Sequence, residues 1–479
     1  MSETPEPPAA PSEAAAPSTP VPATAVPVAG ELLPATRRAL LHRLARAQSE
    51  GRTPSMVGAV VRDGATVWTS GRSMMEGHGP DGDTQYRIGS LTKGFVAVLV
   101  MRLRDEGLLD LTDPVERHLP GTVPGGATIA QLLAHTSGLA AETPGPWWER
   151  TAGELRPEPA DVLGTAPLKH PVGRVHHYSN PGYALLGALV EKVRGRAWGD
   201  VLRAEVLEPL GMARTSLLPQ APHAGGWAVH PWADVMQPEP LHDTGLMAPA
   251  GQLWSTADDL CRWAAFLAAG DERVLSAASV AEMRTPAAAP APDWDAGYGL
   301  GVQLLRRDGR LLAGHTGSMP GFLAALWVSV EDGVGAVVLT NVTSGPQVAT
   351  AAADLVAIVA ENEPRFPAPW RPRSSADPAL LALTGPWYWG TNPFVLRLEA
   401  ERDIELAALN GRGRGARFRA EPDGTWTGLD GYYAGETLRV VRGDDGEVRH
   451  LDLGSFVFTR EPYDPDADVP GGVDPDGWR

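Results

Sequence analysis

The stretch from residue 298 to residue 342 constrains the fold of this 479-residue chain more than any other segment. It contains three or four short strand patterns, with Asp-Gly turn pairs at 308–309 and 332–333 that favour tight hairpins between neighbours. We therefore expect an antiparallel meander here. A strand hairpin is predicted at 56–69 and a covering helix at 348–361, so strands from both ends of this region would join one sheet.

The interval between the hairpin and the meander carries apolar residues mostly at helical spacing. The predicted fold class is therefore α+β, an antiparallel sheet with a helical insert. A short strand is expected at 85–88, and Ser255 is a plausible cap for one helix, with acidic residues in its first turn. The expected helices are 31–50, 90–104, 129–134, 181–193, 256–269 and 276–283.

The pattern changes near residue 363, where a Pro- and Arg-rich joint without periodicity begins. Beyond it the chain shows only short alternating runs punctuated by glycine, which predicts a small all-β domain, either a sandwich or a barrel. The first thirty residues hold eight Pro and eight Ala and read as a disordered tail. The expected organisation is tail 1–30, main domain 31–362, linker 363–379, β-domain 380–463 and tail 464–479.

Composition excludes several classes of protein. The formal charge is −17, from 41 basic and 58 acidic residues, so nucleic acid has no general electrostatic attraction to this surface and is not an expected partner. The chain contains no run of ~18 apolar residues that would predict a membrane span. Its first residues lack the pattern of a secretory signal, so a cytoplasmic location is expected. The single cysteine, Cys261, is interpreted as a small buried helix residue, and no disulfide or thiolate metal site can form within the chain.

A serine and a lysine stand three residues apart where the strand pattern passes into a helix. If Ser90 begins that helix, the amine of Lys93 lies one turn away on the same face. A neutral lysine can take the proton of a serine hydroxyl, whereas an arginine cannot. Only three of the 41 basic residues are lysines, which makes a lysine here informative. The alternative is that Ser90 caps the helix and Lys93 is a solvated charge.

Two further segments could complete such a site. Tyr178 and Asn180 lie just ahead of a predicted helix, where a phenol could carry a proton and an amide could hold the lysine or a substrate amide. In the predicted strand 310–317, a glycine marks a close approach of backbone, and the Ser318 N–H could stabilise an oxyanion. The alternatives are a core tyrosine beside a helix cap, and a turn carrying a surface histidine.

In this order and at these separations, S-x-x-K, Y-x-N and His-Thr-Gly resemble the motif set of the penicillin-recognising serine hydrolases. The chain is similar to the branch that holds class C β-lactamases, D,D-carboxypeptidases, D-aminopeptidases and β-lactamase-like esterases. Similarity covers about residues 31–361 and includes the segments 132–139, 250–260 and 314–322. The resemblance implies a β-lactamase/transpeptidase-like fold, and the C-terminal β-domain resembles the lipocalin-like extensions of some relatives.

The resemblance also implies roles for individual residues. Ser90 would be the acylated nucleophile, Lys93 its base partner and Tyr178 the proton shuttle. The oxyanion hole would be formed by the N–H groups of Ser90 and Ser318. The remaining substrate-binding residues implied by the motifs are Asn180, His315, Thr316, Gly317 and Ser318.

One residue departs from the lactamase pattern, because His315 stands where a lysine is usual before Thr-Gly. With an unperturbed pKa of ~6.5 a histidine is mostly neutral near pH 7 and gains charge on acidification. We therefore expect a serine hydrolase that forms an acyl-enzyme with an ester, a small amide or a D-amino-acid peptide, rather than a strong β-lactamase. A true β-lactamase and an inactive binding or regulatory protein are the alternatives.

The expected partner is a small-molecule or short-peptide substrate, with no membrane and no nucleic acid. No cofactor and no metal are expected, since no metal-ligand motif is present and the rings of the neighbouring pair His176 and His177 would point apart in a strand. His135 is predicted to be a structural hydrogen-bonding residue. The sequence does not indicate an oligomeric state.

Overall fold

A computed structural model describes most of the chain. The described residues divide into two compact units, and the boundary along the chain falls between Phe366 and Pro367. The predicted tail at 1–30 lies outside the described residues, as does most of the predicted tail at 464–479. The described residues are 31–122, 126–151, 162–289, 295–367, 369–370, 372–373, 375–398, 404–411, 413–462, 466, 468 and 472.

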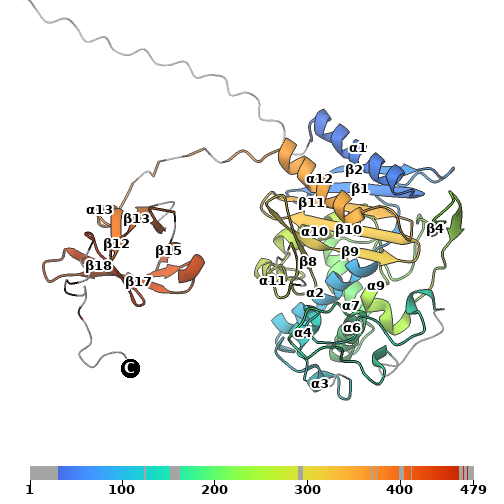
Figure 1. Ribbon diagram of the computed structural model, residues 1–479, viewed down its shortest axis with the longest axis horizontal. Coiled ribbons are helices and arrows are strands. Elements are labelled where there is room, and N and C mark those ends of the chain that lie inside the picture. Colours follow the sequence, from blue (N-terminus) through green and yellow to red (C-terminus); the bar gives the residue numbers. More distant parts are fainter. Residues whose placement is uncertain are drawn as a thin grey trace, which may run out of the picture. The chain divides into compact units, whose positions relative to one another are not determined.

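A seven-stranded antiparallel sheet organises the first unit, in the order β2-β1-β11-β10-β9-β8-β7 (Figure 1). The early hairpin pairs with the last strand of the meander, and Met56 lies opposite Thr340. The prediction of one sheet built from both ends is therefore confirmed. The strands are β1 (Ser55–Arg62), β2 (Ala65–Ser73), β7 (Ala296–Tyr298), β8 (Gln303–Arg307), β9 (Arg310–Met319), β10 (Phe322–Ser329) and β11 (Val334–Thr340).

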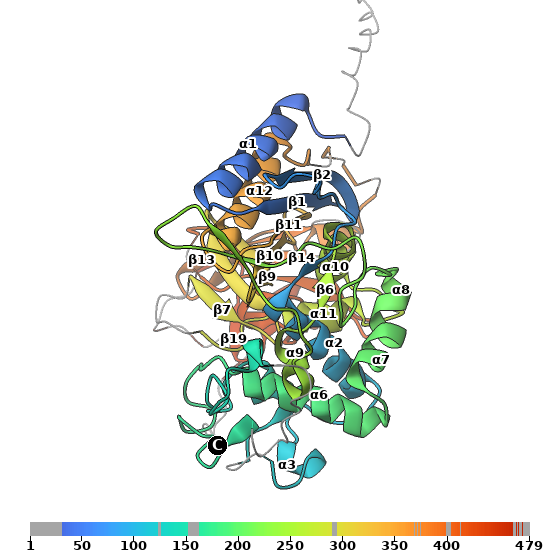
Figure 2. The same ribbon diagram turned by 90° about the vertical axis from the view of Figure 1, so that its right-hand side faces the viewer.

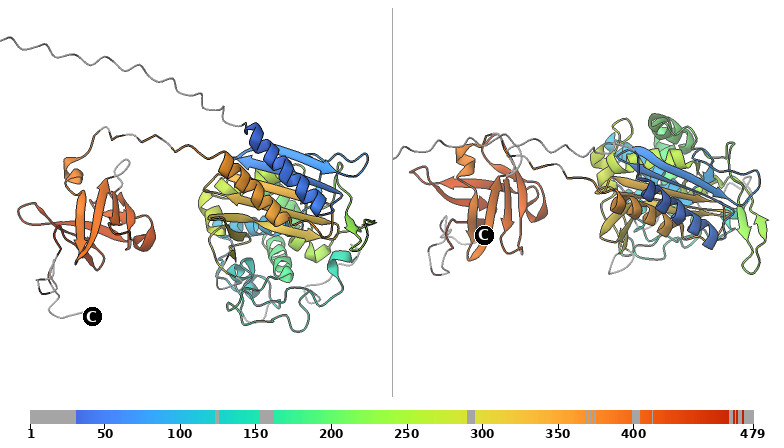
Figure 3. Two further views of the ribbon diagram at one scale, coloured as in Figure 1. Left: turned by 45° about the horizontal axis from the view of Figure 1, so that its top comes forward. Right: turned by 90° about the horizontal axis from the view of Figure 1, so that it is seen from above.

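Helices cover both faces of this sheet. On one face, α1 (Pro34–Glu50) and α12 (Val348–Asn362) lie side by side (Figure 3) and bury Leu40 and Leu355 against the strands. On the other face, α10 (Ala257–Ala269), which belongs to the helical insert, packs on β1 and β11. The predicted α+β class, with its sheet and helical insert, is confirmed.

The insert forms around α2 (Thr92–Asp105), which is buried on nearly all sides. Figure 2 shows α6, α7 and α9 gathered around it. The other elements are α3 (Val115–His118), α4 (Ile129–Leu133), α6 (Asn180–Arg194), α7 (Trp198–Leu202), α8 (Glu208–Leu210), α9 (Ala248–Gly251), α11 (Ala277–Met283) and the two short strand pairs β3 (Tyr86–Arg87) with β6 (Trp254–Ser255) and β4 (Trp227–Val229) with β5 (Met236–Pro238).

The cap of α10 differs from the predicted one. Ser255 belongs to β6, pairs with Tyr86 and has its hydroxyl 2.8 Å from that of Thr215. Thr256 is extended, and its hydroxyl accepts the N–H of Asp259 at 3.1 Å, so Thr256 is the cap. Ser255, which the sequence pattern assigned to the start of the helix, therefore belongs to a two-residue strand.

The C-terminal unit is an eight-stranded antiparallel sheet in sequence order, and a bridge between Tyr388 and Thr459 brings its first and last strands together. It has its own core around Trp387, Leu406 and Phe418. The predicted all-β domain is confirmed, and of the two forms considered, a sandwich or a barrel, it has the barrel-like one. After a short helix, α13 (Pro378–Leu381), the strands are β12 (Gly385–Trp389), β13 (Asn392–Leu398), β14 (Ile404–Ala408), β15 (Ala416–Ala420), β16 (Trp426–Gly428), β17 (Thr437–Arg442), β18 (Val448–Leu453) and β19 (Phe456–Phe458).

Within the described part of the chain, no helix has the length and apolar character needed to cross a membrane.

Candidate active site

Ser90 lies in the turn between a short strand and the central helix. After β3 the chain makes one 3-10 turn, η1 (Gly89–Leu91), and α2 begins at Thr92, so Ser90 precedes the α-helix instead of lying within it. Gly89 has a φ of +54°, and a side chain there would meet the Ser318 N–H at 2.6 Å. The turn can therefore approach β9 only because this residue is glycine.

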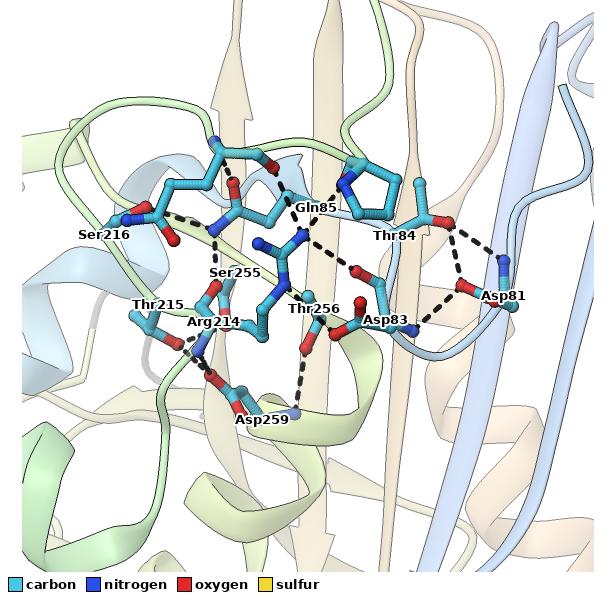
Figure 4. Close-up of polar contacts among 12 residues, drawn as sticks. Asp81, Asp83, Thr84, Gln85, Arg214, Thr215, Ser216, Ser255, Thr256 and Asp259 are labelled. Carbon is cyan, nitrogen blue, oxygen red and sulfur yellow. Dashed lines mark hydrogen bonds and ion pairs between the residues drawn. The ribbon is translucent and has the colours of Figure 1, made fainter.

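A polar network anchors the strand pair behind this turn (Figure 4). The Gln85 side-chain amide donates to the carbonyl of Arg214 at 2.5 Å and to the Ser216 hydroxyl at 3.1 Å, and its oxygen accepts the N–H of Gln220 at 2.6 Å. The Asp259 carboxylate accepts the Arg214 N–H at 2.8 Å. These bonds tie β3 and α10 to the same segment, so Ser90 projects from a fixed support.

Lys93 is fully buried, with its amine at the serine. Nζ lies 2.9 Å from Ser90 Oγ and donates to the carbonyl of Ala250 at 2.6 Å. Burial lowers the pKa of Lys93 to about 7, although the carboxylates of Glu142 and Glu149 act in the opposite direction. The alternative of a solvated helix charge is wrong. An amine held here exchanges its proton near neutral pH.

Tyr178 completes the group around the serine. Its ring centre lies 4.9 Å from Lys93 Nζ, and its side chain is half-buried. Burial raises the pKa of the Tyr178 phenol, while a hydrogen bond with Ser90 acts against that rise. The phenol therefore keeps its proton at ordinary pH and is positioned to exchange it with Ser90.

Asn180 holds a carboxylate instead of the lysine. It is the first residue of α6, and its amide donates to Glu142 Oε1 at 2.6 Å. The other Glu142 oxygen accepts the indole N–H of Trp148 at 2.9 Å, and the Glu142 side chain remains exposed. Of the two partners expected for Asn180, the lysine is bound by the Ala250 carbonyl instead. A contact between Asn180 and a substrate amide stays a prediction.

His135 is a buried support for Tyr178. The two ring centres are 4.2 Å apart, and His135 Nδ1 accepts the N–H of Ser179 at 3.0 Å. Burial holds the pKa of His135 well below its usual value, so its ring is neutral. The predicted structural, hydrogen-bonding role of this histidine is confirmed.

Strand β9 forms the other wall. A side chain at Gly317 would lie 1.9 Å from the carbonyl of Ile88, which confirms the close approach predicted from this glycine. β8 pairs with β9 only as far as Gly314, so Gly317 and Ser318 lie beyond that pairing, next to the turn that carries Ser90. A pocket of about 450 Å³ opens here; its lining includes Ser90, Tyr178, Gln303, Thr316, Gly317 and Ser318.

His315 differs from the expectation drawn from the sequence. It is buried, its Nδ1 lies 2.5 Å from the Thr316 carbonyl, and its Nε2 lies 2.9 Å from the Tyr298 hydroxyl. These partners are satisfied by one neutral tautomer, in which Nδ1–H donates and Nε2 accepts. Burial lowers the pKa of His315 to about 3, and the nearby Lys93 adds to this effect. The expected charge gain near pH 6.5 is wrong, and so is the alternative of a surface histidine.

Four residues at or beside the site escaped sequence reasoning: Glu142, Ala250, Gln303 and Tyr298. Ala250 contributes only a carbonyl, and Gln303 accepts the Thr316 N–H at 3.0 Å from a neighbouring strand. Ala250 is the first residue of the family-like segment 250–260, but no residue type there marks its carbonyl, and Gln303 belongs to no motif. Glu142 follows the family-like segment 132–139 closely, which was its only signal.

Among the described residues, no group of three or more histidine, cysteine, aspartate or glutamate side chains is arranged to hold a metal ion. The rings that surround the site are instead packed against one another, as with His135 and Tyr298 at 4.6 Å between centres.

The fold and the serine–lysine geometry together define a class, the proteins with the β-lactamase/transpeptidase fold. Comparison with family models agrees: the model described as Beta-lactamase matches residues 41–361, and the chain belongs to that family, whose characterised members are hydrolases. A second model, described as a domain of unknown function (DUF7586), matches residues 376–460.

Individual relatives give the same assignment. Penicillin-binding protein 4 of Amycolatopsis lactamdurans is 32% identical over 54% of this chain and 72% of its own length, while the chain spans about half the length of several other curated relatives. A D-stereospecific amidohydrolase from Streptomyces sp. is 27% identical with a TM-score of 0.57. A D-amino acid amidase from Ochrobactrum anthropi SV3 is 26% identical with a TM-score of 0.58. Both structures cover 68% of this chain and are themselves covered to 98%.

Proposed function

We propose that this protein is a serine hydrolase that works through an acyl-enzyme and cleaves small amides or short peptides whose acyl part is a D-amino acid with a free amine. The observation that carries the proposal is the buried amine of Lys93, 2.9 Å from Ser90 Oγ, with its pKa lowered to about 7. A serine hydroxyl becomes a useful nucleophile only when a neighbouring base takes its proton, and this amine is neutral at the pH where it is needed.

In the proposed reaction, the neutral amine of Lys93 accepts the hydroxyl proton as Ser90 Oγ bonds to the substrate carbonyl carbon. The carbonyl oxygen becomes an oxyanion between the N–H groups of Ser90 and Ser318. The C–N bond then breaks, the leaving nitrogen receives a proton through Tyr178, and the acyl group stays on Ser90. Water attacks this ester, and the carboxylic acid leaves as the serine regains its proton.

The charges of the site favour an amine on the acyl side. Asn180 and Trp148 each donate one hydrogen bond to Glu142, so its exposed carboxylate retains lone pairs for a substrate ammonium. His315 is neutral above about pH 3, and Lys93 is neutral above about pH 7, so neither offers a lasting cation to a substrate carboxylate. This argues against efficient turnover of carboxylate-bearing β-lactams.

The comparisons support this choice of substrate. Two of the similar structures are a D-stereospecific amidohydrolase and a D-amino acid amidase, the latter complexed with L-phenylalanine amide. Esters with the same acyl part are expected to react too, because an alkoxide leaves more readily than an unprotonated amide nitrogen. The cytoplasmic location stays a prediction from the sequence.

The test combines labelling with a substrate series. Intact mass after treatment with a fluorophosphonate should show one adduct on the wild type and none on Ser90→Ala. Hydrolysis of D-phenylalanine p-nitroanilide should exceed that of its L enantiomer and of its N-acetyl derivative. An adduct that persists on Ser90→Ala would place the nucleophile elsewhere.

A matched pair of variants tests the acyl-side charge. Glu142→Gln should raise KM for the free amine far more than for the N-acetyl compound. Glu149→Gln is the control, because this carboxylate also acts on the pKa of Lys93 but its Oε2 accepts the indole N–H of Trp147. If both variants change the two substrates alike, Glu142 acts through Lys93 and does not bind the amine.

A further inference from the structure

The C-terminal unit contains a cavity of about 230 Å³ that is separate from the serine site. It lies among the turn between β12 and β13, the loop before β15, and β19. The family model for this region is a domain of unknown function, so it assigns no ligand. A space of this size holds a single aromatic ring with a short substituent.

Aromatic side chains form most of the wall. Phe394 and Phe458 are buried at the base, with ring centres 5.1 Å apart in an edge-to-face contact. Phe456 and Trp389 form a second ring pair at 5.5 Å, and Trp389 keeps 45% of its surface exposed. A small domain gains stability by burying its largest apolar side chains, so rings left around a void point to an apolar ligand.

One guanidinium lies at the rim of this aromatic wall. The Arg414 guanidinium carbon is 3.8 Å from the Tyr432 ring centre and 5.3 Å from that of Phe456. Stacking covers the face of a guanidinium and leaves its N–H edge free, and that edge matches a carboxylate with two parallel hydrogen bonds.

Four other arginines of this unit differ from Arg414 in their partners. Within the described residues Arg414 makes no ion pair, although four others in the same unit each pair with a carboxylate: Arg397 with Glu405, Arg417 with Asp430, Arg419 with Glu421 and Arg449 with Asp445. Arg414 is thus held by rings at a cavity while its charge is left for another partner.

We propose that this cavity is a binding site for a small carboxylate that carries an aromatic or branched apolar group. The apolar group would pack against Phe394, Phe456 and Phe458, and the carboxylate would bind the N–H edge of Arg414. A cationic ligand is disfavoured, because Arg414 already stacks on Tyr432 and would repel a second positive charge.

Three probes with one ring and different head groups test the charge requirement on the full chain. Phenylacetate, neutral phenylacetamide and cationic phenethylamine would be titrated by calorimetry and by saturation-transfer NMR, after Ser90 has been blocked with a fluorophosphonate. We expect phenylacetate to bind at least tenfold more tightly than the other two. Equal binding of acid and amide, or no binding of phenylacetate at millimolar concentration, would overturn the proposal.

Variants locate the bound probe. Arg414→Leu should weaken phenylacetate at least tenfold and leave phenylacetamide unchanged, and Arg414→Lys should lie between, since it keeps the charge but not the paired N–H edge. Arg419→Leu is the matched control, because Arg419 is an exposed arginine of the same unit that is not among the residues lining the cavity. Unchanged phenylacetate binding in Arg414→Leu, or an equal loss in Arg419→Leu, contradicts the assignment.

Discussion

Lys93 on α2 and His315 on β9 are two buried nitrogen bases close enough for the charge of one to lower the pKa of the other, yet they titrate in different pH ranges. Burial lowers the pKa of both. The amine starts from 10.5 and its pKa falls to about 7, whereas the imidazole starts from 6.5 and its pKa falls to about 3. The same desolvation makes the lysine titrate near neutrality and keeps the histidine neutral.

The difference shows that the pKa of a side chain in a protein depends on both its residue type and its environment. A histidine is the usual titrating group near pH 7 in an exposed position, but in this interior the lysine has that property. The partners reinforce the outcome: the Lys93 amine donates to the Ala250 carbonyl, while the His315 ring is held between the Thr316 carbonyl and the Tyr298 hydroxyl.

The largest expected effect comes from removing the amine that can lose its proton. Lys93→Arg should lose at least ~10³-fold in kcat/KM, as severely as Lys93→Ala, because a guanidinium cannot act as a base. Initial rates with D-phenylalanine p-nitroanilide measure this. Lys169→Arg and Lys192→Arg are the controls, since both lysines are exposed. Substantial activity in Lys93→Arg would show that only a fixed positive charge is needed.

The next effect is the pH dependence of the wild type. Because the pKa of Lys93 is lowered to about 7, the neutral amine is the minor form below pH 7 and the major form above it. For a neutral p-nitrophenyl ester, kcat/KM should fall about tenfold per pH unit below 7 and level off above it. A level profile between pH 5 and 8 would contradict the role of this amine as the base.

A smaller effect is expected at His315. In the wild type, a carboxylate-bearing D-peptide and a neutral ester should show parallel pH profiles from 5.5 to 7, where the peptide amine stays charged, because the pKa of His315 is lowered to about 3 and its charge does not change in this range. His315→Lys should raise the relative kcat/KM for the carboxylate substrate several-fold. The added positive charge should also lower the pKa of Lys93, so the fall in kcat/KM on acidification should begin at a lower pH. If the wild-type preference for the carboxylate substrate strengthens on acidification, His315 gains charge in this pH range and the prediction is wrong.

Much of the fold was predictable from local patterns. The Asp-Gly turns between alternating apolar runs gave the meander, and the strands of the hairpin were placed to within a few residues. The S-x-x-K spacing also placed the Lys93 amine at Ser90 correctly, since three residues make about one helical turn.

Sequence reasoning failed where the answer depends on which groups are desolvated together. The pKa of His315 is set by neighbours from several elements, and the Ala250 carbonyl that binds Lys93 is a main-chain group with no sequence signature. Glu142 reaches the site only because the chain near residue 140 runs beside the start of α6, where the Asn180 N–H donates to the Ala141 carbonyl at 2.9 Å. Such contacts are products of the tertiary fold.

The smallest expected effect concerns stability, and it follows from the same buried amine. The pKa of Lys93 is lowered from 10.5 in the open chain to about 7 in the folded protein, so between these values the unfolded state binds more protons. The free energy of unfolding therefore rises as pH increases from 7 toward 10.5, because folding no longer has to bury a charged amine. Below pH 7 the buried amine is charged, and the full destabilisation by this group is present. Lys93→Met, which fills the space without a charge, should raise Tm by a few degrees at pH 6 and by less at pH 9. Differential scanning calorimetry at both pH values measures this, with Lys192→Met as the exposed control. If the gain at pH 9 equals the gain at pH 6, packing and not the buried charge explains it, and the contrast between the lysine and the histidine loses its electrostatic basis.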